Sequence, residues 1–282
     1  MRCSLIALAG RPNAGKSTLL NHLCGHKISI VSDKPQTTRF AVRGVRTDNQ
    51  IQLVFVDTPG LHKPVTALGE SVNTSALGAL EDVDAVCLVL DATAPFGSGD
   101  RWVAEQLPSA ASGKMVVVVN KVDIATRAQV LKMLTVVGEL GASAYFPVSA
   151  KTGDGLDVLL RHLLDAAPEG PWLFPDDMVT DLPEDVWMAE LVREQLLLVT
   201  RDELPYSIAT RVVENDGRRV RVEIIVERES QKGMVIGKGG SILKDVGTRA
   251  RAHLPEGTFL ELVVKVDKDW QRRADRVSRL GY

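Results

Sequence analysis

Gly10-Arg11-Pro12-Asn13-Ala14-Gly15-Lys16-Ser17 is the stretch that decides the fold of this 282-residue chain. Glycines near both of its ends let backbone N–H groups close around phosphate oxygens, and a following helix adds the positive end of its dipole. An apolar run over residues 4–9 precedes it and a helical pattern over 16–24 follows, which is the context that a P-loop requires. The stretch therefore predicts a nucleotide site, with Lys16 on the β- and γ-phosphates and the Ser17 hydroxyl on Mg²⁺.

The apolar runs that follow predict an α/β fold. Runs rich in Val and Leu are separated by long polar or helical segments, at residues 51–56, 85–90, 115–119 and 144–148. This spacing is typical of buried parallel strands joined by crossover helices. A turn at Thr47-Asp48-Asn49-Gln50 joins segment 40–46 to the run 51–56 and favours one hairpin. We expect a doubly wound, mainly parallel sheet with one antiparallel edge.

The segment Pro168-Glu169-Gly170-Pro171 ends this pattern and predicts a domain boundary. The chain length also favours two domains. We expect a P-loop nucleotide-binding domain over 1–170, a linker with the first helix of the second domain over 171–200, and a smaller α+β domain over 201–282. This second domain is predicted from an amphipathic helix over 184–200, a hairpin around Asn215-Asp216-Gly217, a Gly-rich turn at 237–240 between helices, and a strand over 259–266.

Two short motifs after the P-loop supply further magnesium and phosphate chemistry. Asp57 ends the strand 51–56, where its carboxylate can reach Mg²⁺ through a water, and Gly60 lets a backbone N–H approach the γ-phosphate. In Gln36-Thr37-Thr38-Arg39, Thr38 is the preferred second hydroxyl ligand to Mg²⁺, with Thr37 as the alternative.

Asn120-Lys121-Val122-Asp123 and Ser149-Ala150-Lys151 decide which base is read. An ionised Asp123 accepts two N–H bonds from the Watson–Crick edge of guanine, whereas adenine would leave the carboxylate unpaired. The Ala150 N–H is expected near the guanine oxygen. These motifs favour GTP over the ATP of a P-loop kinase or another metabolic phosphate-transferring enzyme.

The predicted nucleotide site is thus assembled from five segments. Its catalytic members are Lys16, Thr38 and Gly60, and its metal ligands are Ser17, Thr38 and Asp57. The full GTP-binding set is Gly10, Arg11, Pro12, Asn13, Ala14, Gly15, Lys16, Ser17, Thr18, Asp57, Thr58, Pro59, Gly60, Leu61, Asn120, Lys121, Asp123, Ser149, Ala150 and Lys151.

Leu61 stands where Ras-like enzymes hold a glutamine that orients the attacking water. Leucine cannot hydrogen-bond water, so we expect slow intrinsic hydrolysis that depends on another group. His62 is a candidate substitute base, and the alternative is an ordinary solvent-exposed loop histidine.

Charge and composition add limits. The formal net charge is −2, which predicts no partner, but residues 231–282 carry 11 basic and 6 acidic side chains. A basic end is compatible with nucleic acid or an anionic membrane surface. Cys3, Cys24 and Cys87 have no metal-binding or redox spacing, no signal peptide is visible, and the longest apolar runs are too short to span a bilayer. We expect a monomeric cytoplasmic protein with reduced thiols.

With these motifs, nearly the whole chain resembles the Era family of GTPases. In the second half, the resemblance lies in Glu203-Leu204-Pro205-Tyr206-Ser207, Val226-Glu227-Arg228-Glu229, Gln231-Lys232 and Met234-Val235-Ile236-Gly237. It implies a GTPase that binds 16S ribosomal RNA near its 3′ end and assists small-subunit maturation. It also implies peripheral membrane association in some members, for which this sequence gives no direct support. By similarity, Asn13 holds a K⁺ ion; the alternative is that Asn13 only fixes the loop.

The Gly237-Lys238-Gly239-Gly240 turn resembles that of a type II KH domain, in which glycines let a single RNA strand approach. The predicted RNA-binding set is Ile236, Gly237, Lys238, Gly239, Gly240, Lys244, Arg249 and Arg251. Ile236, Ile242 and Leu243 are candidates for the groove that receives bases, although some of them must be core. Many relatives carry a second basic residue where this chain has Gly239 and Ile242, so we expect more weight on Lys244 and the tail Arg272, Arg273, Arg276 and Arg279.

The resulting hypothesis is a GTPase in which bound GTP and Mg²⁺ order the segments around Thr38 and after Asp57, and thereby control RNA binding by the KH domain. A membrane-associated regulatory GTPase and a metabolic P-loop enzyme are the alternatives.

Overall fold

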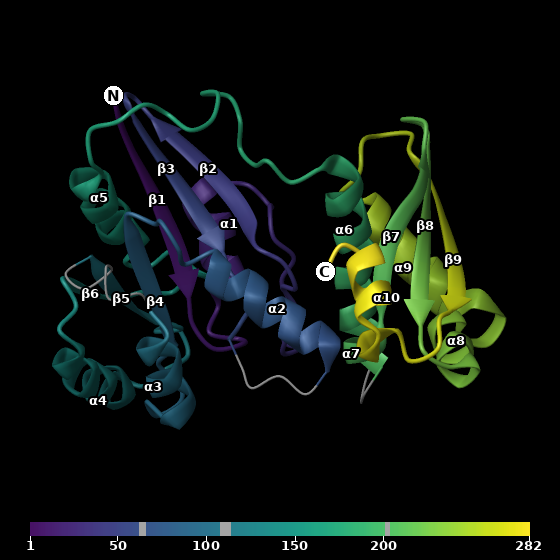
Figure 1. Ribbon diagram of the computed structural model, residues 1–282, viewed down its shortest axis with the longest axis horizontal. Coiled ribbons are helices and arrows are strands. Elements are labelled where there is room, and N and C mark those ends of the chain that lie inside the picture. The colour runs from purple at the N-terminus through teal and green to yellow at the C-terminus, as the bar shows by residue number, and fades with distance from the viewer. Residues whose placement is uncertain (62–65, 108–113, 201–203) are drawn as a thin grey trace. The chain divides into compact units, whose positions relative to one another are not determined.

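The computed structural model describes residues 1–61, 66–107, 114–200 and 204–282. By their contacts these form two compact units (Figure 1). The first holds most of the chain up to Asp181, and the second holds Leu182–Tyr282 together with the segment Ser32–Thr37 and the described residues 66–71. Residues 171–181 therefore lie with the first unit, and the 184–199 helix lies with the second.

The first unit is built on a six-stranded sheet in the order β2-β3-β1-β4-β5-β6, in which only the β2–β3 pair is antiparallel. This confirms the predicted mainly parallel sheet with one antiparallel edge. Helix α2 (Ala67–Gly78) is divided, because its residues 67–71 group with the second unit and the rest with the first. The other strands and helices of the first unit are β1 (Arg2–Ala9), α1 (Lys16–Cys24), β2 (Val42–Asp48), β3 (Ile51–Asp57), β4 (Ala85–Asp91), α3 (Ser98–Glu105), β5 (Met115–Asn120), α4 (Arg127–Val137), β6 (Ala144–Pro147) and α5 (Leu156–Ala166).

The inner parallel strands β1, β4 and β5 are largely buried, as their continuous apolar runs require, whereas the edge strand β6 is only partly buried. In β5, Val116–Asn120 are all buried, and Val117 and Val119 pack in a cluster with Leu88 and Leu90 of β4. The β2–β3 hairpin is tighter than predicted, because β2 continues through Asp48, which pairs with Ile51. The turn is therefore only Asn49-Gln50, and Asn49 takes the left-handed conformation at φ 53° that such turns favour.

Residues after α5 run along the β2–β3 edge of this sheet. Gln52 of β3 is fully buried, and its Oε1 accepts from the N–H groups of Leu173 and Phe174 at 2.9 and 3.0 Å, while its Nε2 donates to the Phe174 carbonyl at 2.8 Å. Further along, Val45 N–H donates to Val179 O at 2.8 Å. The segment thus covers an edge strand whose backbone groups would otherwise be open to pairing.

The second unit has a three-stranded sheet in the order β7-β8-β9, with β7–β8 antiparallel and β8–β9 parallel. The predicted hairpin is confirmed: Asp216 Oδ1 accepts from the N–H groups of Arg218 and Arg219, and Gly217 has φ 84°. The elements are α6 (Glu184–Val199), α7 (Leu204–Ser207), β7 (Ala209–Asn215), β8 (Arg219–Val226), α8 (Glu229–Ile236), the 3₁₀ turn η3 (Lys238–Gly240), α9 (Ser241–Arg251), β9 (Phe259–Val266) and α10 (Ala274–Arg279).

Helix α6 differs from the amphipathic helix that its sequence suggested. Met188, Val192 and Leu196 pack into the core of the second unit, but every residue from Met188 to Leu197 is buried, including four polar side chains, Glu190, Arg193, Glu194 and Gln195. The apolar periodicity of the sequence did not predict the burial of these polar side chains, because both the apolar and the polar face of the helix are covered.

Among the residues that the structure describes, no helix is long and apolar enough to cross a membrane.

We predict that Gln52→Leu destabilises the chain. Leucine keeps roughly the volume but leaves the partly buried N–H groups of Leu173 and Phe174 without their acceptor, which should lower the free energy of unfolding by about 1–3 kcal/mol. Urea denaturation measures the loss. Gln50→Leu, at an exposed position in the turn, is the control and should cost less than about 0.5 kcal/mol. Equal losses in the two variants would contradict the anchoring role of Gln52.

Candidate functional site

Two glycines of the P-loop are required by its geometry. Gly10 has φ 157°, and a Cβ there would lie 2.4 Å from the Val89 carbonyl oxygen. Gly15 has φ 96° and caps the start of α1, and its Cβ would lie 2.2 Å from Asn120 Nδ2. Neither position has space for a side chain, so the loop backbone can lie close to β4 and β5 and present its N–H groups at the start of α1.

Lys16 is buried at the first position of α1. Its Nζ donates to the carbonyl oxygens of Gly10 and Arg11 at 3.0 and 3.1 Å, so the side chain folds back over the loop. Burial lowers the pKa of Lys16 to about 8, an effect that nearby Asp57 opposes. The ammonium has three N–H donors, so the two carbonyls leave one for a phosphate oxygen.

The carboxylate of Asp57 lies beside the hydroxyls of Ser17 and Thr38, and these three predicted magnesium ligands form the Asp57 cluster. Its Oδ2 accepts from Ser17 Oγ at 2.7 Å and from Thr38 Oγ1 at 3.4 Å, and the two hydroxyls lie 2.9 Å apart. Burial raises the pKa of Asp57, while Lys16 and these hydroxyls oppose the rise.

These oxygens fit a magnesium ion. Asp57 is fully buried, and its Oδ1 has no hydrogen-bond partner among the described residues. A buried carboxylate oxygen without a donor is costly, and a cation beside it would remove that cost. A carboxylate with two hydroxyls is the hard oxygen set that Mg²⁺ takes together with waters and phosphates.

The structure distinguishes the two threonines left open by the sequence. Thr38 places its hydroxyl in the Asp57 cluster, whereas Thr37 Oγ1 donates to the Lys34 carbonyl at 2.6 Å. The geometry therefore favours Thr38 as the ligand.

Asn120 joins the phosphate loop to the loop after β6. Its Nδ2 donates to the Ala14 carbonyl at 2.8 Å, and its Oδ1 accepts from the Ala150 N–H at 2.9 Å. The side chain is buried. The Ala150 N–H that we expected near the guanine oxygen thus makes an internal bond here.

Asp123 is exposed at the carboxyl end of the sheet, and its Oδ1 accepts from Ser149 Oγ at 2.8 Å. Lys121 has φ 70° and donates to Asp91 Oδ2 at 2.6 Å. Although burial acts to raise the pKa of Asp91, hydrogen bonds from Lys121 and Thr93 hold it below its usual value. Ser149 thus orients Asp123, and Asp91 orients Lys121. Asp91 is a site residue that the sequence analysis missed. Its position at the end of β4 was the available signal.

The predicted site residues in the loop after β3 make different kinds of contact. A Cβ on Gly60 would lie 2.6 Å from Pro12 N, which places this backbone directly against the P-loop. Thr58 Oγ1 donates to the Leu8 carbonyl at 2.8 Å, and Leu61 is buried in the apolar cluster with Ala7 and Ala9. Thr58 and Leu61 therefore have structural contacts. His62 lies outside the described residues, as does Glu203 of the second half.

In the second unit, the Gly-rich turn follows α8. Gly237, Gly239 and Gly240 have φ between 62° and 78°. A Cβ on Gly237 would lie 2.7 Å from Ile242 Cγ1, whereas Cβ atoms on Gly239 and Gly240 would meet nothing within 4 Å. The turn is therefore closed against α9 on one side and open on the other, and Lys238 is exposed there.

The side chains predicted to contact RNA differ in their exposure and in the internal partners that they already have. Lys238 and Lys244 are exposed, while Arg249 is paired with Asp245 at 3.0 Å and Arg251 Nε donates to the Gly247 carbonyl at 3.1 Å. Ile236, Ile242 and Leu243 are partly buried against the core, as the sequence analysis allowed for some of them. In the tail, Arg273 and Arg276 are paired with Asp275 and Asp267.

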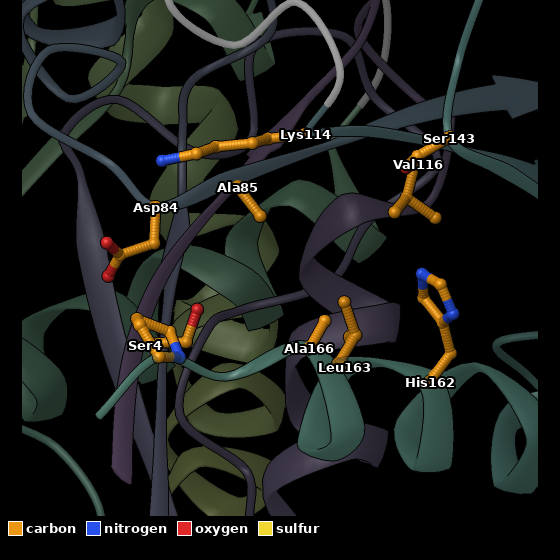
Figure 2. Close-up of a pocket in the computed structure, with 10 residues that line it drawn as sticks. Ser4, Asp84, Ala85, Lys114, Val116, Ser143, His162, Leu163 and Ala166 are labelled. Carbon is orange, nitrogen blue, oxygen red and sulfur yellow. The ribbon is translucent and has the colours of Figure 1, made fainter.

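A separate cavity of about 330 Å³ lies in the first unit near the amino-terminal ends of β1, β4 and β5 (Figure 2). Two polar side chains of its lining already form hydrogen bonds with backbone groups. Asp84 Oδ2 accepts from the Leu5 N–H at 2.9 Å, and Ser143 Oγ donates to the Met115 carbonyl at 2.8 Å. Ligands of such sheets bind at the carboxyl ends of the strands, so we do not place the functional site in this cavity.

Comparisons with known proteins agree with this division of the chain. Residues 5–121 match the family described as "50S ribosome-binding GTPase", and residues 203–271 match the KH domain. The protein called GTPase Era in Mycobacterium tuberculosis H37Rv is 46% identical over 292 aligned positions, covering 98% of this chain and 97% of that protein. Its counterpart in Mycobacterium sp. KMS is 44% identical, with 100% and 99% covered.

Two solved structures are similar over the full chain. A crystal structure of Era with MgGDPNP and nucleotides 1506–1542 of 16S ribosomal RNA has a TM-score of 0.94 at 39% identity, covering 100% of this chain and 99% of that one. A point variant of Aquifex aeolicus Era bound to GDP·AlF₄⁻ has a TM-score of 0.93 at 39% identity with the same coverage. The predicted resemblance is confirmed.

We predict that Thr38→Ala and Thr37→Ala separate the two hydroxyls. Loss of Thr38 Oγ1 removes a group from the Asp57 cluster and should slow GTP hydrolysis about 100-fold. Loss of Thr37 Oγ1 removes only its bond to Lys34 and should change the rate less than about threefold. Single-turnover hydrolysis at saturating Mg²⁺ measures both. The reverse order would assign the ligand role to Thr37.

Proposed function

The chain belongs to the Era family of GTPases, and we propose that its nucleotide state controls binding of 16S ribosomal RNA by the KH unit during assembly of the small ribosomal subunit. The observation that carries this proposal is the likeness over the whole chain to an Era structure that holds MgGDPNP and the 1506–1542 segment of 16S RNA together. Both functional halves of that protein have counterparts here.

The choice of ribosomal subunit depends on the KH unit. The family description that names the 50S subunit concerns residues 5–121 only, which is the nucleotide unit shared by many GTPases. The RNA-binding unit follows it in sequence, and the similar full-length structure contains 16S RNA. The small subunit is therefore the proposed partner.

In the proposed nucleotide complex, the P-loop N–H groups and Lys16 bind the phosphates, and Asp123 accepts the two guanine N–H groups. Mg²⁺ would be held by Ser17, Thr38 and, through water, Asp57, and it neutralises phosphate charge when bound. Gly60 presents its N–H towards the γ-phosphate. Because Leu61 points into the apolar core, it cannot orient water, and slow intrinsic hydrolysis is expected.

Asn13 is the proposed ligand of a potassium ion. It lies in the P-loop with φ 64°, a conformation that asparagine tolerates better than most residues, so a purely structural role is the competing explanation. We predict that hydrolysis is about tenfold faster in K⁺ than in Na⁺, and that Asn13→Ala abolishes the difference. A steady-state GTPase assay in matched salts measures this. An equal loss for Asn13→Ala in both salts would support the structural role alone.

The proposed RNA surface is centred on the open side of the Gly237–Gly240 turn. Lys238 and Lys244 are exposed and have the strongest case for phosphate contacts. The ion pair with Asp245 offsets the charge of Arg249, so its contribution should be smaller.

The test of the proposed function uses variants in the two units. Lys16→Ala should abolish GTP binding, whereas Lys238→Ala combined with Lys244→Ala should leave GTP affinity unchanged and weaken binding of a 1506–1542 RNA segment about 10-fold or more at 150 mM salt. Calorimetry with GTP and filter binding with RNA measure the two effects. Lys232→Ala is a control outside the turn. Unchanged RNA affinity in the double lysine variant would refute the groove assignment.

Membrane association remains the competing proposal. Its support was the basic tail, and Arg273 and Arg276 form ion pairs with acidic side chains of the same region. Their charge is therefore partly offset, which weakens the case for the membrane, and we propose a cytoplasmic RNA-binding protein that acts as a monomer. Co-sedimentation of the chain with anionic vesicles at 150 mM salt would favour the membrane instead.

A further inference from the structure

Helix α6 carries a buried polar cluster that the nucleotide chemistry above does not use. Arg193 is fully buried, and its Nε and Nη2 atoms donate to the two carboxylate oxygens of Glu190 at 2.7 and 2.5 Å. Glu190 is buried as well. The carboxylate raises the pKa of Arg193 against the effect of burial, so the guanidinium is charged. Because desolvation makes a buried ion pair a weak source of stability, this pair needs another explanation.

The guanidinium also binds backbone. Arg193 Nη2 donates to the carbonyl oxygen of Thr37, a residue that by its contacts belongs to the second unit, whereas Thr38 belongs to the first. Thr38 in turn places its hydroxyl 2.9 Å from Ser17 Oγ. One planar peptide unit therefore joins a carbonyl held by α6 to a hydroxyl in the Asp57 cluster.

We propose that Arg193 is a positioning residue that fixes the Thr37 carbonyl and thereby couples the occupancy of the Thr38 site to helix α6 of the RNA-binding unit. The proposal rests on the proposed function, in which Thr38 binds Mg²⁺ when GTP is present. Glu190 holds the guanidinium fork in place, and the fork gives the Thr37 carbonyl a charged donor inside a dry environment, where such a bond is strong.

The coupling acts in both directions. If GTP and Mg²⁺ hold Thr38 where the Arg193–Thr37 bond is made, then the arrangement of α6 that makes this bond favours GTP by the same factor. GDP, which has no γ-phosphate, gains little from Thr38, so its affinity should hardly depend on Arg193.

The test replaces the ion pair with apolar residues. Glu190→Met together with Arg193→Met keeps volume and leaves no unpaired buried charge, and such replacements are often neutral or stabilising. Arg219→Gln with Glu261→Gln is the matched control, because it removes an ion pair of 2.6 Å between β8 and β9. Calorimetry gives the affinities for GDP and for a non-hydrolysable GTP analogue with Mg²⁺, and RNA binding is measured in each nucleotide state.

We expect the Met pair to lower affinity for the GTP analogue about tenfold and to change that for GDP less than about twofold. The ratio of RNA affinities between the two nucleotide states should move towards one, while the RNA affinity of the GDP state stays the same. The control should change none of these values.

An equal loss for both nucleotides would show a merely structural role and overturn the proposal, as would an unchanged affinity for the GTP analogue. Arg193→Lys is the second variant if the Met pair does not fold: it keeps the charge beside Glu190 but not the planar fork, and the same selective loss is expected. Failure of the wild-type chain to bind GTP would refute the proposed function and not the role of Arg193.

Discussion

The two hydrogen bonds of the Asn120 side chain set the separation between the phosphate end and the base end of the nucleotide site. One bond holds the P-loop at Ala14 and the other holds the loop after β6 at Ala150. The amide lies so close to Gly15 that a side chain there would clash. Because one buried group fixes both loops, the distance from Lys16 to Asp123 is a property of the fold, and it selects a ligand that has phosphates at one end and a matching base at the other.

The second constraint is the charge buried at the end of β3. Asp57 is fully buried with one oxygen bonded to hydroxyls and the other without a donor among the described residues. Lys16 offsets part of this charge, and a magnesium ion beside a nucleotide would offset more. Thr38 brings the preceding segment to this cluster, and Arg193 holds the carbonyl of the adjacent Thr37. These contacts link the Asp57 carboxylate, through Thr38 and Thr37, to helix α6, which lies more than 100 residues further along the chain.

The sequence was sufficient for the sheet, the hairpins and the convergence of five motifs, because each depends on local turn chemistry, apolar periodicity or a fixed spacing. It did not predict the partners of polar side chains outside those motifs. Gln52 reads as an ordinary polar residue of a strand, yet it anchors Leu173 and Phe174. Arg193 reads as the exposed face of an amphipathic helix, yet it is fully buried. Arg249 reads as a free phosphate contact, yet it is paired with Asp245. None of these partners follows from periodicity.

The preference of this chain for guanine nucleotides depends on the Asp123 carboxylate. Adenine would present a lone pair at the position where guanine offers an N–H, so the carboxylate would face an acceptor. Calorimetric titration of the wild-type chain with GTP and with ATP, both with Mg²⁺, is the most direct test. We expect ATP to bind about 10⁴-fold more weakly than GTP. ATP affinity within about tenfold of that for GTP would contradict it.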